Sequence, residues 1–228
     1  MEELFNQHLF EGTIILIFAY LLGSIPSSVW IGKSFYGKDV RDFGSKNAGA
    51  TNTFRVLGKT AGWIVLTMDV LKGFFATSLV YVLMKWSGLR FDNADRVNIM
   101  LGLGFAAVIG HLLPVFAGFR GGKGIATLSG MIIALNYQLT LIASALFLIT
   151  LFLTRFVSMS SIIAGISVPV LFVSVFGLDH PEYRQPTVVF FTVSIAVLVV
   201  YTHRKNIIRL IHGNESKAKL LPKHRRID

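Results

Sequence analysis

The feature that most constrains the fold of this chain is a series of apolar runs, each about 20 residues long, separated by short charged segments. About 20 apolar residues are needed for an α-helix to cross the hydrocarbon core of a bilayer, which is roughly 30 Å thick. Of the 228 residues, 53% are hydrophobic and only 15% are charged, whereas a soluble domain carries about 25% charged residues. The sequence therefore predicts an all-α, polytopic membrane helix bundle and excludes an ordinary soluble domain.

Six of the apolar runs have about the required length, and one more is short. We expect spans near 13–32, 61–84, 97–117, 138–154, 156–176 and 186–202, with a shorter apolar helix over 125–137. The short helix would extend only about 20 Å at ~1.5 Å per residue, so it must borrow neighbouring residues or sit where the bilayer is thin. The sequence shows no internal repeat and no low-complexity tract. We therefore interpret 1–228 as a single integral membrane domain.

The distribution of Lys and Arg favours one orientation in the membrane. The segments 33–60, 118–124 and 203–228 carry Lys and Arg, whereas the N-terminus and the segment 177–185 are acidic in balance. Basic residues near span ends prefer the cytoplasm. An odd number of spans puts the acidic N-terminus outside and the basic tail, 203–228, in the cytoplasm, so about seven transmembrane helices are predicted rather than six. The formal net charge of +10 is thus mainly a topology signal, and no nucleic acid is expected as a partner.

Two features of composition and of the N-terminal segment narrow the chemistry and the processing. The chain has no Cys, which excludes disulfides, a thioester on a Cys nucleophile and Cys-based metal sites. The first residues, MEELFNQHLFEG, contain no Lys or Arg and so lack the basic region of a cleaved signal peptide. We expect the first apolar run to stay as a span, and we predict neither a metal nor a cofactor.

The first polar segment that is unsuited to a simple connector is Gly44-Ser-Lys-Asn-Ala-Gly-Ala-Thr-Asn52, followed by Arg55. Glycines permit tight backbone conformations that direct N–H groups inward, and Arg adds a planar, permanently charged fork. A topology signal requires charge but not this density of Gly, Ser, Asn and Thr. We predict a site for phosphate or carboxylate here, with the candidate residues Gly44, Ser45, Asn47, Gly49, Thr51, Asn52 and Arg55.

The second such segment, 111–127, passes from one apolar run through the Gly-rich turn Arg120-Gly-Gly-Lys-Gly124 into another. Backbone N–H groups at the start of the following helix, with Lys123 beside them, can bind an anion. The segment is not a Walker A loop, because Ala117 and Gly124 stand where that loop has Gly and Ser or Thr. A flexible hairpin between two spans explains the glycines equally well. The candidate anion ligands are Gly121, Gly122, Lys123 and Gly124.

The third segment, 203–215, follows the last apolar run. If the helix continues beyond residue 202, His203, Asn206 and Arg209 lie on one face at i, i+3 spacing. Anchoring to anionic lipid explains basic residues such as Arg204. It explains His203 and Asn206 less well, so these two residues are candidates for the site.

Polar residues also occur inside the apolar runs. Asp69 and Lys72 lie well within the second run, where ionisable groups are costly and usually paired, and we expect them to form a pair. Ser158, Ser160 and Ser161 open a later run. Helix packing is the default interpretation of these serines, and contact with substrate is the alternative.

Taken in order, the segments 44–55, 110–127 and 203–215 resemble the three motifs of the PlsY family, the bacterial acyl-phosphate:glycerol-3-phosphate acyltransferases. The resemblance extends from the first span to about Glu215. It implies that an acyl group passes from acyl phosphate to the 1-hydroxyl of sn-glycerol 3-phosphate, giving lysophosphatidic acid and phosphate in the first step of phospholipid synthesis. It also implies a multi-pass protein of the bacterial inner membrane, in contact with membrane lipid, with its active site on the cytoplasmic side.

The resemblance also assigns roles by position. Lys46 stands where the family often has Gly, which bears on the shape of the first loop. Asp69 and Lys72 are expected to be structural, as is Glu215, and Ser161 matches a serine that contacts substrate. The catalytic residues implied by position are Ser45, Arg55, Lys123, His203 and Asn206.

The expected chemistry needs no covalent nucleophile. Acyl phosphate is a mixed anhydride with a good leaving group, so positioning and charge neutralisation can supply most of the catalysis. We expect direct attack, with His203 or the leaving phosphate accepting the hydroxyl proton. None of the six His is followed by Asp five residues later, which argues against the family of glycerol-phosphate acyltransferases marked by that spacing. The alternatives are a membrane transporter of a phosphorylated anion and a membrane phosphatase.

Overall fold

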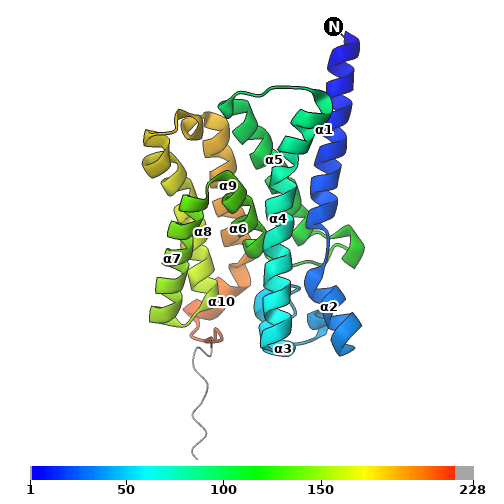
Figure 1. Ribbon diagram of the computed structural model, residues 1–228. Helices are drawn as coiled ribbons and strands as arrows, with labels where there is room; N and C mark the ends of the chain where they lie inside the picture. Colours follow the sequence, from blue (N-terminus) through cyan, green and yellow to red (C-terminus); the bar gives the residue numbers. More distant parts are fainter. Residues whose placement is uncertain (1, 219–228) are drawn as a thin grey trace, which may run out of the picture.

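The computed structural model describes residues 2–218, and within this range the chain forms helices and no strands. Figure 1 shows long helices packed side by side, with shorter helices and loops at the two ends of the bundle. The described chain begins at one end of the bundle and finishes at the other. The α-helices are α1 Glu2–Gly23, α2 Ser27–Tyr36, α3 Ala50–Val56, α4 Lys59–Ser87, α5 Asn93–Leu112, α6 Ile125–Leu135, α7 Tyr137–Thr154, α8 Val157–Val170, α9 Pro186–Thr202 and α10 Arg204–Ile211.

Single turns of other helix types join these elements. α8 continues through a π-helical turn and a 3₁₀ turn, and the other three 3₁₀ turns lie in loops. The turns are η1 Val40–Asp42, η2 Val115–Ala117, η3 Leu171–Val175, η4 Phe176–Leu178 and η5 Pro181–Arg184.

The apolar runs of the sequence coincide with helices of the bundle. Within residues 2–218, four helical stretches are long and apolar enough to cross a membrane, namely Lys59–Ser87, Asn93–Ala117, Tyr137–Thr154 and Val157–Leu178. The bent pairs α1–α2 and α9–α10 raise this number to six if each counts as one span. The all-helical membrane architecture is therefore confirmed. The count of seven spans and the orientation of the termini stay predictions, and the residues 219–228 of the expected cytoplasmic tail lie outside the described part.

The short helix α6 packs inside the bundle against α4 and α5. It has 11 residues, or about 17 Å at ~1.5 Å per residue. Glycines let its backbone approach α4 closely: a Cβ on Gly73 would lie 2.0 Å from the Thr127 carbonyl oxygen, and one on Gly130 would lie 1.9 Å from that of Val70. Small residues are the usual means by which membrane helices come this close.

The span expected over 13–32 is not one straight helix, because the structure divides it into α1 and α2 with a bend of 43°. Pro26 lies in the break, and Pro cannot continue a helix because it lacks an N–H and its ring clashes with the preceding turn. In the break the carbonyl oxygen of Ile25 accepts from the Ser27 N–H at 3.0 Å and from Lys72 Nζ at 2.9 Å. The break is thus tied to α4 by a charged side chain.

The last expected span, 186–202, coincides with α9, and the helix does not continue straight through His203. α9 ends at Thr202, α10 starts at Arg204, and the two are bent by 56°. His203 between them has φ −96° and ψ 4°, in the sparsely populated region between the α and β conformations. His203 and Asn206 are nevertheless both buried, so the bend turns α10 across the end of the bundle and keeps both residues inside.

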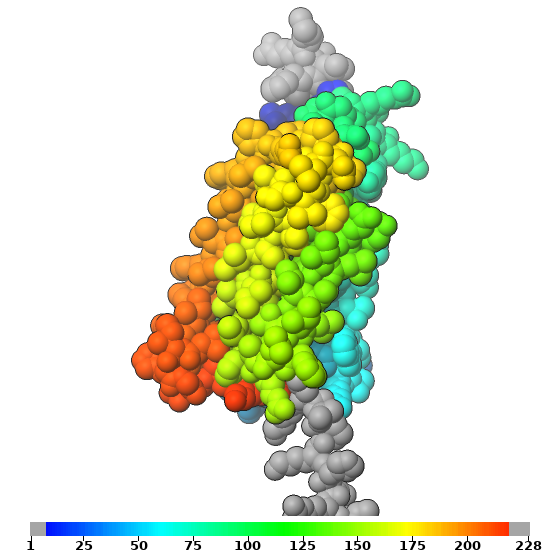
Figure 2. All heavy atoms as spheres, turned by 90° about the vertical axis from the view of Figure 1, so that its left-hand side faces the viewer, coloured from blue at the N-terminus to red at the C-terminus, as the bar shows by residue number. Residues whose placement is uncertain are grey.

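Apolar side chains form both the interior and the outer wall. One buried cluster joins α5, α6, α7, α8 and α9 and includes Leu101, Met131 and Phe172, while a second joins α1, α4 and α5. Figure 2 shows the outer face that α7, α8 and α9 form, in green, yellow and orange. Large apolar side chains such as Phe152 and Phe190 are exposed on these helices, as expected for helices that face lipid.

Candidate active site

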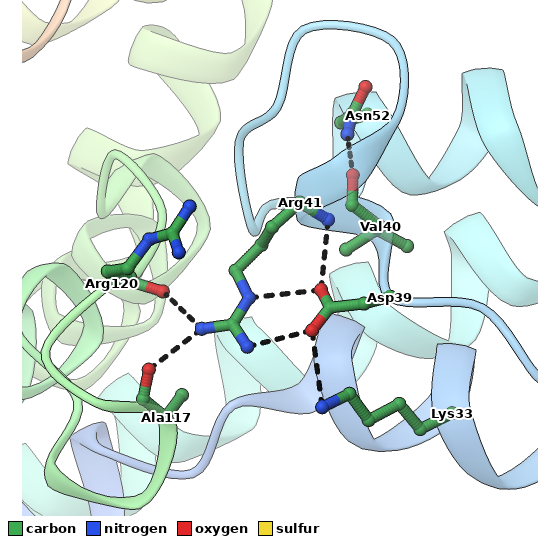
Figure 3. Close-up of polar contacts among 7 residues, drawn as sticks. All are labelled: Lys33, Asp39, Val40, Arg41, Asn52, Ala117 and Arg120. Atoms are coloured by element: carbon green, nitrogen blue, oxygen red, sulfur yellow. Dashed lines mark hydrogen bonds and ion pairs between the residues drawn. The ribbon is translucent and has the colours of Figure 1, made fainter.

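Asn52 shapes the first polar loop. Its side-chain Nδ2 donates to the carbonyl oxygens of Val40 at 2.8 Å and Phe43 at 3.1 Å, and its Oδ1 accepts from the Ser45 N–H at 2.9 Å. Figure 3 shows the bond to Val40. Asn52 is almost fully buried. Because both ends of its amide are engaged by the protein, its observed role is to fold the loop around Ser45.

Left-handed backbone conformations complete this loop. Gly44 has φ +60°, and a Cβ on it would lie 2.4 Å from Asn52 Oδ1, so only Gly fits. Lys46 has φ +58°, a conformation that disfavours side chains other than Gly, Asn and Asp. This agrees with the expectation that Lys46 bears on the shape of the loop.

The loop leads into α3, which carries Arg55 in its last turn. Ser45, Thr51 and Arg55 are exposed, and Asn47 is partly exposed. Gly49 caps the helix, and its carbonyl oxygen accepts from the Asn52 and Thr53 N–H groups, each at 3.1 Å. The loop therefore presents hydroxyl, amide and guanidinium groups to its surroundings at one end of the bundle.

The glycines of the second loop are explained by close packing on the end of α5. The Gly121 N–H donates to the Leu112 carbonyl oxygen at 3.2 Å, and the Gly122 N–H donates to that of His111 at 3.1 Å. A Cβ on Gly121 would lie 2.0 Å from the His111 carbonyl oxygen, and one on Gly122 would lie 2.1 Å from His111 Nε2. Two of the N–H groups that we expected to face an anion are thus used within the protein.

Lys123 and Gly124 follow at the start of α6. Gly124 caps this helix with φ +83° and without a side-chain hydrogen bond, and the first N–H groups of a helix have no partner within it. A Cβ on Gly122 would lie 3.0 Å from the Ala48 carbonyl oxygen. The first and second loops are therefore in contact beside Lys123.

A buried polar cluster lies beneath the second loop. Lys72 Nζ is 2.9 Å from Asp69 Oδ1, which confirms the expected pair. The Ser27 hydroxyl donates to the same oxygen at 2.9 Å, and His111 Nδ1 is 3.6 Å from it. The cluster joins α2, α4 and α5, and its His111 ring supports Gly122. We interpret it as the foundation of the loop.

Glu215 is the centre of the third segment. Its carboxylate accepts from the Ser158 hydroxyl at 2.8 Å, from Asn206 Nδ2 at 2.6 Å and from Arg209 Nε at 2.7 Å. Burial alone would raise the pKa of Glu215, but these hydrogen bonds outweigh it and hold the pKa below its ordinary value. The carboxylate thus fixes the Asn206 side chain through its amide nitrogen.

Lys123 joins the second loop to the third segment. Its Nζ donates a short hydrogen bond to Asn206 Oδ1. Burial, together with the positive charges of Arg209 and Arg55, lowers the pKa of Lys123 to about 8, although the Glu215 carboxylate acts in the opposite direction. Arg55 is therefore near enough for its charge to be felt at Lys123. Lys123 thus bonds the third segment directly and feels the charge of the first through Arg55.

His203 is oriented as a proton acceptor. Its Nδ1 is 2.8 Å from the Val199 carbonyl oxygen, and a carbonyl oxygen can only accept. Nδ1 therefore carries the proton in the neutral ring, and Nε2 is left as an acceptor. The ring is buried, on the same end of the bundle as Asn206.

Ser161 stands apart from these contacts. It is buried, and its hydroxyl donates to the Val157 carbonyl oxygen at 2.9 Å, one turn earlier in α8. Ser158 is the serine that reaches the third segment, through Glu215. Sequence reasoning had weighed both serines but had no signal for this partner, because the contact joins positions that are 57 residues apart.

The family model for glycerol-3-phosphate acyltransferases matches residues 13–213 of the chain. The chain belongs to the glycerol-3-phosphate acyltransferase family. It is 45% identical over 206 residues to a glycerol-3-phosphate acyltransferase of Listeria monocytogenes serotype 4a (strain HCC23), a match that covers 90% of this chain and 96% of the relative. It is 44% identical over 207 residues to one of Enterococcus faecalis (strain ATCC 700802 / V583), which covers 90% of each.

Solved structures of an integral membrane acyltransferase support the same family assignment. The crystal structure of PlsY, an integral membrane glycerol 3-phosphate acyltransferase, in its glycerol 3-phosphate form is 38% identical with a TM-score of 0.78 and covers 91% of this chain and 95% of its own. The lysophosphatidic acid form is 36% identical with a TM-score of 0.74 and covers 90% and 94%. The sequence resemblance to the PlsY family is thereby confirmed, and the protein is a membrane acyltransferase of phospholipid synthesis.

Proposed function

We propose that this acyltransferase moves a fatty acyl group from acyl phosphate to the 1-hydroxyl of sn-glycerol 3-phosphate, giving lysophosphatidic acid and phosphate. The observation that carries the proposal is that Lys123 bonds Asn206 of the third segment where the second loop contacts the first at Ala48, at one end of an apolar bundle. Both substrates carry phosphate, and cationic groups that converge from different segments are suited to hold two phosphates close together. The apolar outer wall suits the acyl chain of the donor.

The two cationic groups have different geometry. Arg55 offers a planar fork that can bind a phosphate through two parallel hydrogen bonds, whereas Lys123 offers a single charged amine. Ser45 and the N–H groups at the start of α6 add neutral donors around them. We therefore assign the anion sites to the first and second loops, without deciding which substrate each one holds.

The reaction is a direct transfer. The 1-hydroxyl oxygen of glycerol 3-phosphate attacks the carbonyl carbon of acyl phosphate, so that an ester C–O bond forms and the C–O bond to phosphate breaks. The hydroxyl proton passes to His203 Nε2 or to the departing phosphate. Lys123, whose amine is held by Asn206 Oδ1, stabilises the negative charge that develops on the carbonyl and phosphate oxygens. No residue of the chain forms a covalent bond to the acyl group.

The decisive experiment supplies purified protein with a long-chain acyl phosphate in the presence and in the absence of glycerol 3-phosphate. We expect release of inorganic phosphate to depend strictly on glycerol 3-phosphate and to match lysophosphatidic acid one to one. Phosphate release without the acceptor would indicate a phosphatase instead. Formation of lysophosphatidic acid from acyl-CoA at an equal or higher rate would overturn the proposed donor. Trapping of a labelled acyl group on Ser45 would overturn direct transfer.

We further propose that the enzyme crosses a bacterial inner membrane seven times, with its N-terminus outside and the active site in the cytoplasm. The Lys and Arg near the ends of α2, α3 and α10 support this orientation. The chain has no Cys, so single introduced thiols can report topology. A membrane-impermeant maleimide should label Asp179→Cys in intact cells and Lys205→Cys only after permeabilisation. The reverse pattern would invert the topology.

A further inference from the structure

Arg41 is held rigidly by Asp39 at the start of the first loop (Figure 3). Arg41 Nε donates to Asp39 Oδ1 at 3.0 Å, and Arg41 Nη2 donates to Asp39 Oδ2 at 2.8 Å. The Arg41 backbone N–H donates to Asp39 Oδ1 as well, at 3.0 Å. The two side chains are only 14% exposed. The bidentate pair therefore fixes the plane of the guanidinium and leaves its Nη1 pointing away from Asp39.

The Nη1 group of Arg41 binds the second loop. It donates to the carbonyl oxygen of Ala117 at 2.7 Å and lies 3.4 Å from that of Arg120, more than 70 residues away in the sequence. Between these carbonyls, Gly118 and Phe119 have φ +63° and +58°. A left-handed Phe is disfavoured, so this part of the loop depends on outside contacts to keep its shape. Arg41 supplies such contacts at both sides of the disfavoured turn.

The 3₁₀ turn that contains Arg41, η1, is also bonded to the first anion loop. The carbonyl oxygen of Val40 accepts from Asn52 Nδ2 at 2.8 Å, and Asn52 Oδ1 in turn holds the Ser45 N–H. Val40 is fully buried. Hydrogen bonds thus run from Ser45 through Asn52 to Val40, and the next residue, Arg41, continues the connection with its own hydrogen bonds to the loop that ends in Lys123.

We propose that Arg41, oriented by Asp39, is a positioning residue that fixes the first anion loop against the second and so sets the spacing between the two phosphate sites. This inference deepens the proposed function and rests on it. A reaction catalysed by positioning depends on the distance between its two bound substrates, and a displacement of about 1 Å can lower the rate by about 10²-fold. Arg41 itself need not touch either substrate.

We call the contacts of Arg41 with Asp39 and with the carbonyl oxygens of Ala117 and Arg120 the joint between the loops. Its chemistry requires Arg at position 41. The guanidinium uses Nε and Nη2 on the carboxylate and Nη1 on the carbonyls, whereas a Lys amine is a point charge that cannot span both. The hydrogen bonds from Arg41 hold the pKa of Asp39 well below its usual range. The carboxylate therefore stays charged, and the joint stays closed, across the pH range in which the enzyme would work.

Steady-state kinetics of four variants test the positioning role. For Arg41→Ala, Arg41→Lys and Asp39→Asn we expect kcat to fall by about 10- to 100-fold, with the KM for each substrate changed less than threefold. The matched control is Lys33→Ala, which removes a 59% exposed amine from the same carboxylate and leaves the second loop untouched. Its kcat should stay within twofold of the unmodified enzyme. An unchanged kcat per folded molecule in Arg41→Ala, even with lower thermal stability, would overturn the proposal.

A distance measurement tests the joint without substrate. Because the chain has no Cys, spin labels can be attached at Lys38→Cys and Val115→Cys, one beside each loop. Pulsed electron paramagnetic resonance then measures the distribution of distances between the two labels. We expect Arg41→Ala to broaden the distribution and Lys33→Ala to leave it narrow. An equally narrow distribution in Arg41→Ala would overturn the inference. A failure of the proposed acyl transfer would show instead in the kinetics of the unmodified enzyme, so the two failures are distinguishable.

Discussion

Lys123, at the end of the glycine-rich loop, donates a hydrogen bond to the side-chain oxygen of Asn206, 83 positions further along the chain. The Asn206 amide nitrogen is held by Glu215 at 2.6 Å, so the position of the amine depends on a carboxylate that it does not touch. Charge and geometry at Lys123 are therefore properties of the assembled fold and not of the loop alone. The first two predictions follow from this relationship.

The activity should fall as pH rises through the pKa of Lys123. Burial lowers this pKa to about 8, and only the protonated amine neutralises a phosphate. We expect kcat/KM, which reports ionisations of the free enzyme, to decrease above pH 8 by about tenfold per pH unit. In Lys123→Arg, whose guanidinium stays protonated, the alkaline decrease should disappear up to about pH 9.5. A decrease that persists unchanged in Lys123→Arg would contradict this assignment.

Glu215→Gln should weaken catalysis and move the same pH profile. Gln has one acceptor oxygen where the carboxylate has two, so it cannot accept from Arg209 and from Asn206 and Ser158 as Glu215 does, and we expect kcat/KM to fall by about tenfold. The Glu215 charge raises the pKa of Lys123, so its removal should shift the alkaline limb to lower pH. Ser158→Ala, which removes one neutral donor to the same carboxylate, is the control and should leave the limb in place.

The helices could be predicted from the sequence because apolar length alone decides where a membrane helix can form. Their breaks were harder. Pro26 marks the division of α1 from α2 in the sequence. The span expected over 13–32 was based on hydropathy alone and did not take this Pro into account. The bend at His203 has no Pro or Gly within it, so local sequence could not reveal it.

The candidate site was found as a set of segments but not as a set of contacts. Asn52 and the pair Gly121 and Gly122 stood out because they are polar or flexible, yet their hydrogen bonds shape the loops. Arg41 looked like one more basic residue of a cytoplasmic segment. Its role depends on carbonyl oxygens in another loop, and tertiary contacts of this kind leave no pattern in a single sequence.

His203 should act as the proton acceptor of the reaction. Its Nδ1 is committed to the Val199 carbonyl oxygen, which leaves Nε2 available, and general-base catalysis contributes about 10²- to 10⁴-fold. We therefore expect His203→Gln to lower kcat by about 10²-fold with little change in KM. Added imidazole should restore part of the rate to His203→Ala. A rate for His203→Gln within threefold of the unmodified enzyme would assign the proton to the departing phosphate.

Lys72 should be essential for stability although it is not among the proposed phosphate ligands. Its amine pairs with Asp69 at 2.9 Å and donates to the carbonyl oxygen of Ile25 in the break between α1 and α2. Both side chains of the pair are almost fully buried, and removing one partner of a buried pair costs about 3–5 kcal/mol because the other charge is left unpaired. Lys72→Met should therefore lower the free energy of unfolding by about 3 kcal/mol, since Ser27 and His111 still face Asp69.

The double variant Asp69→Asn with Lys72→Met should be less destabilised than Lys72→Met alone, because no charge then remains buried. Denaturation of the purified protein in detergent measures both. A double variant that is less stable than Lys72→Met would show that the cluster is held by the hydrogen bonds of Asp69 rather than by charge pairing.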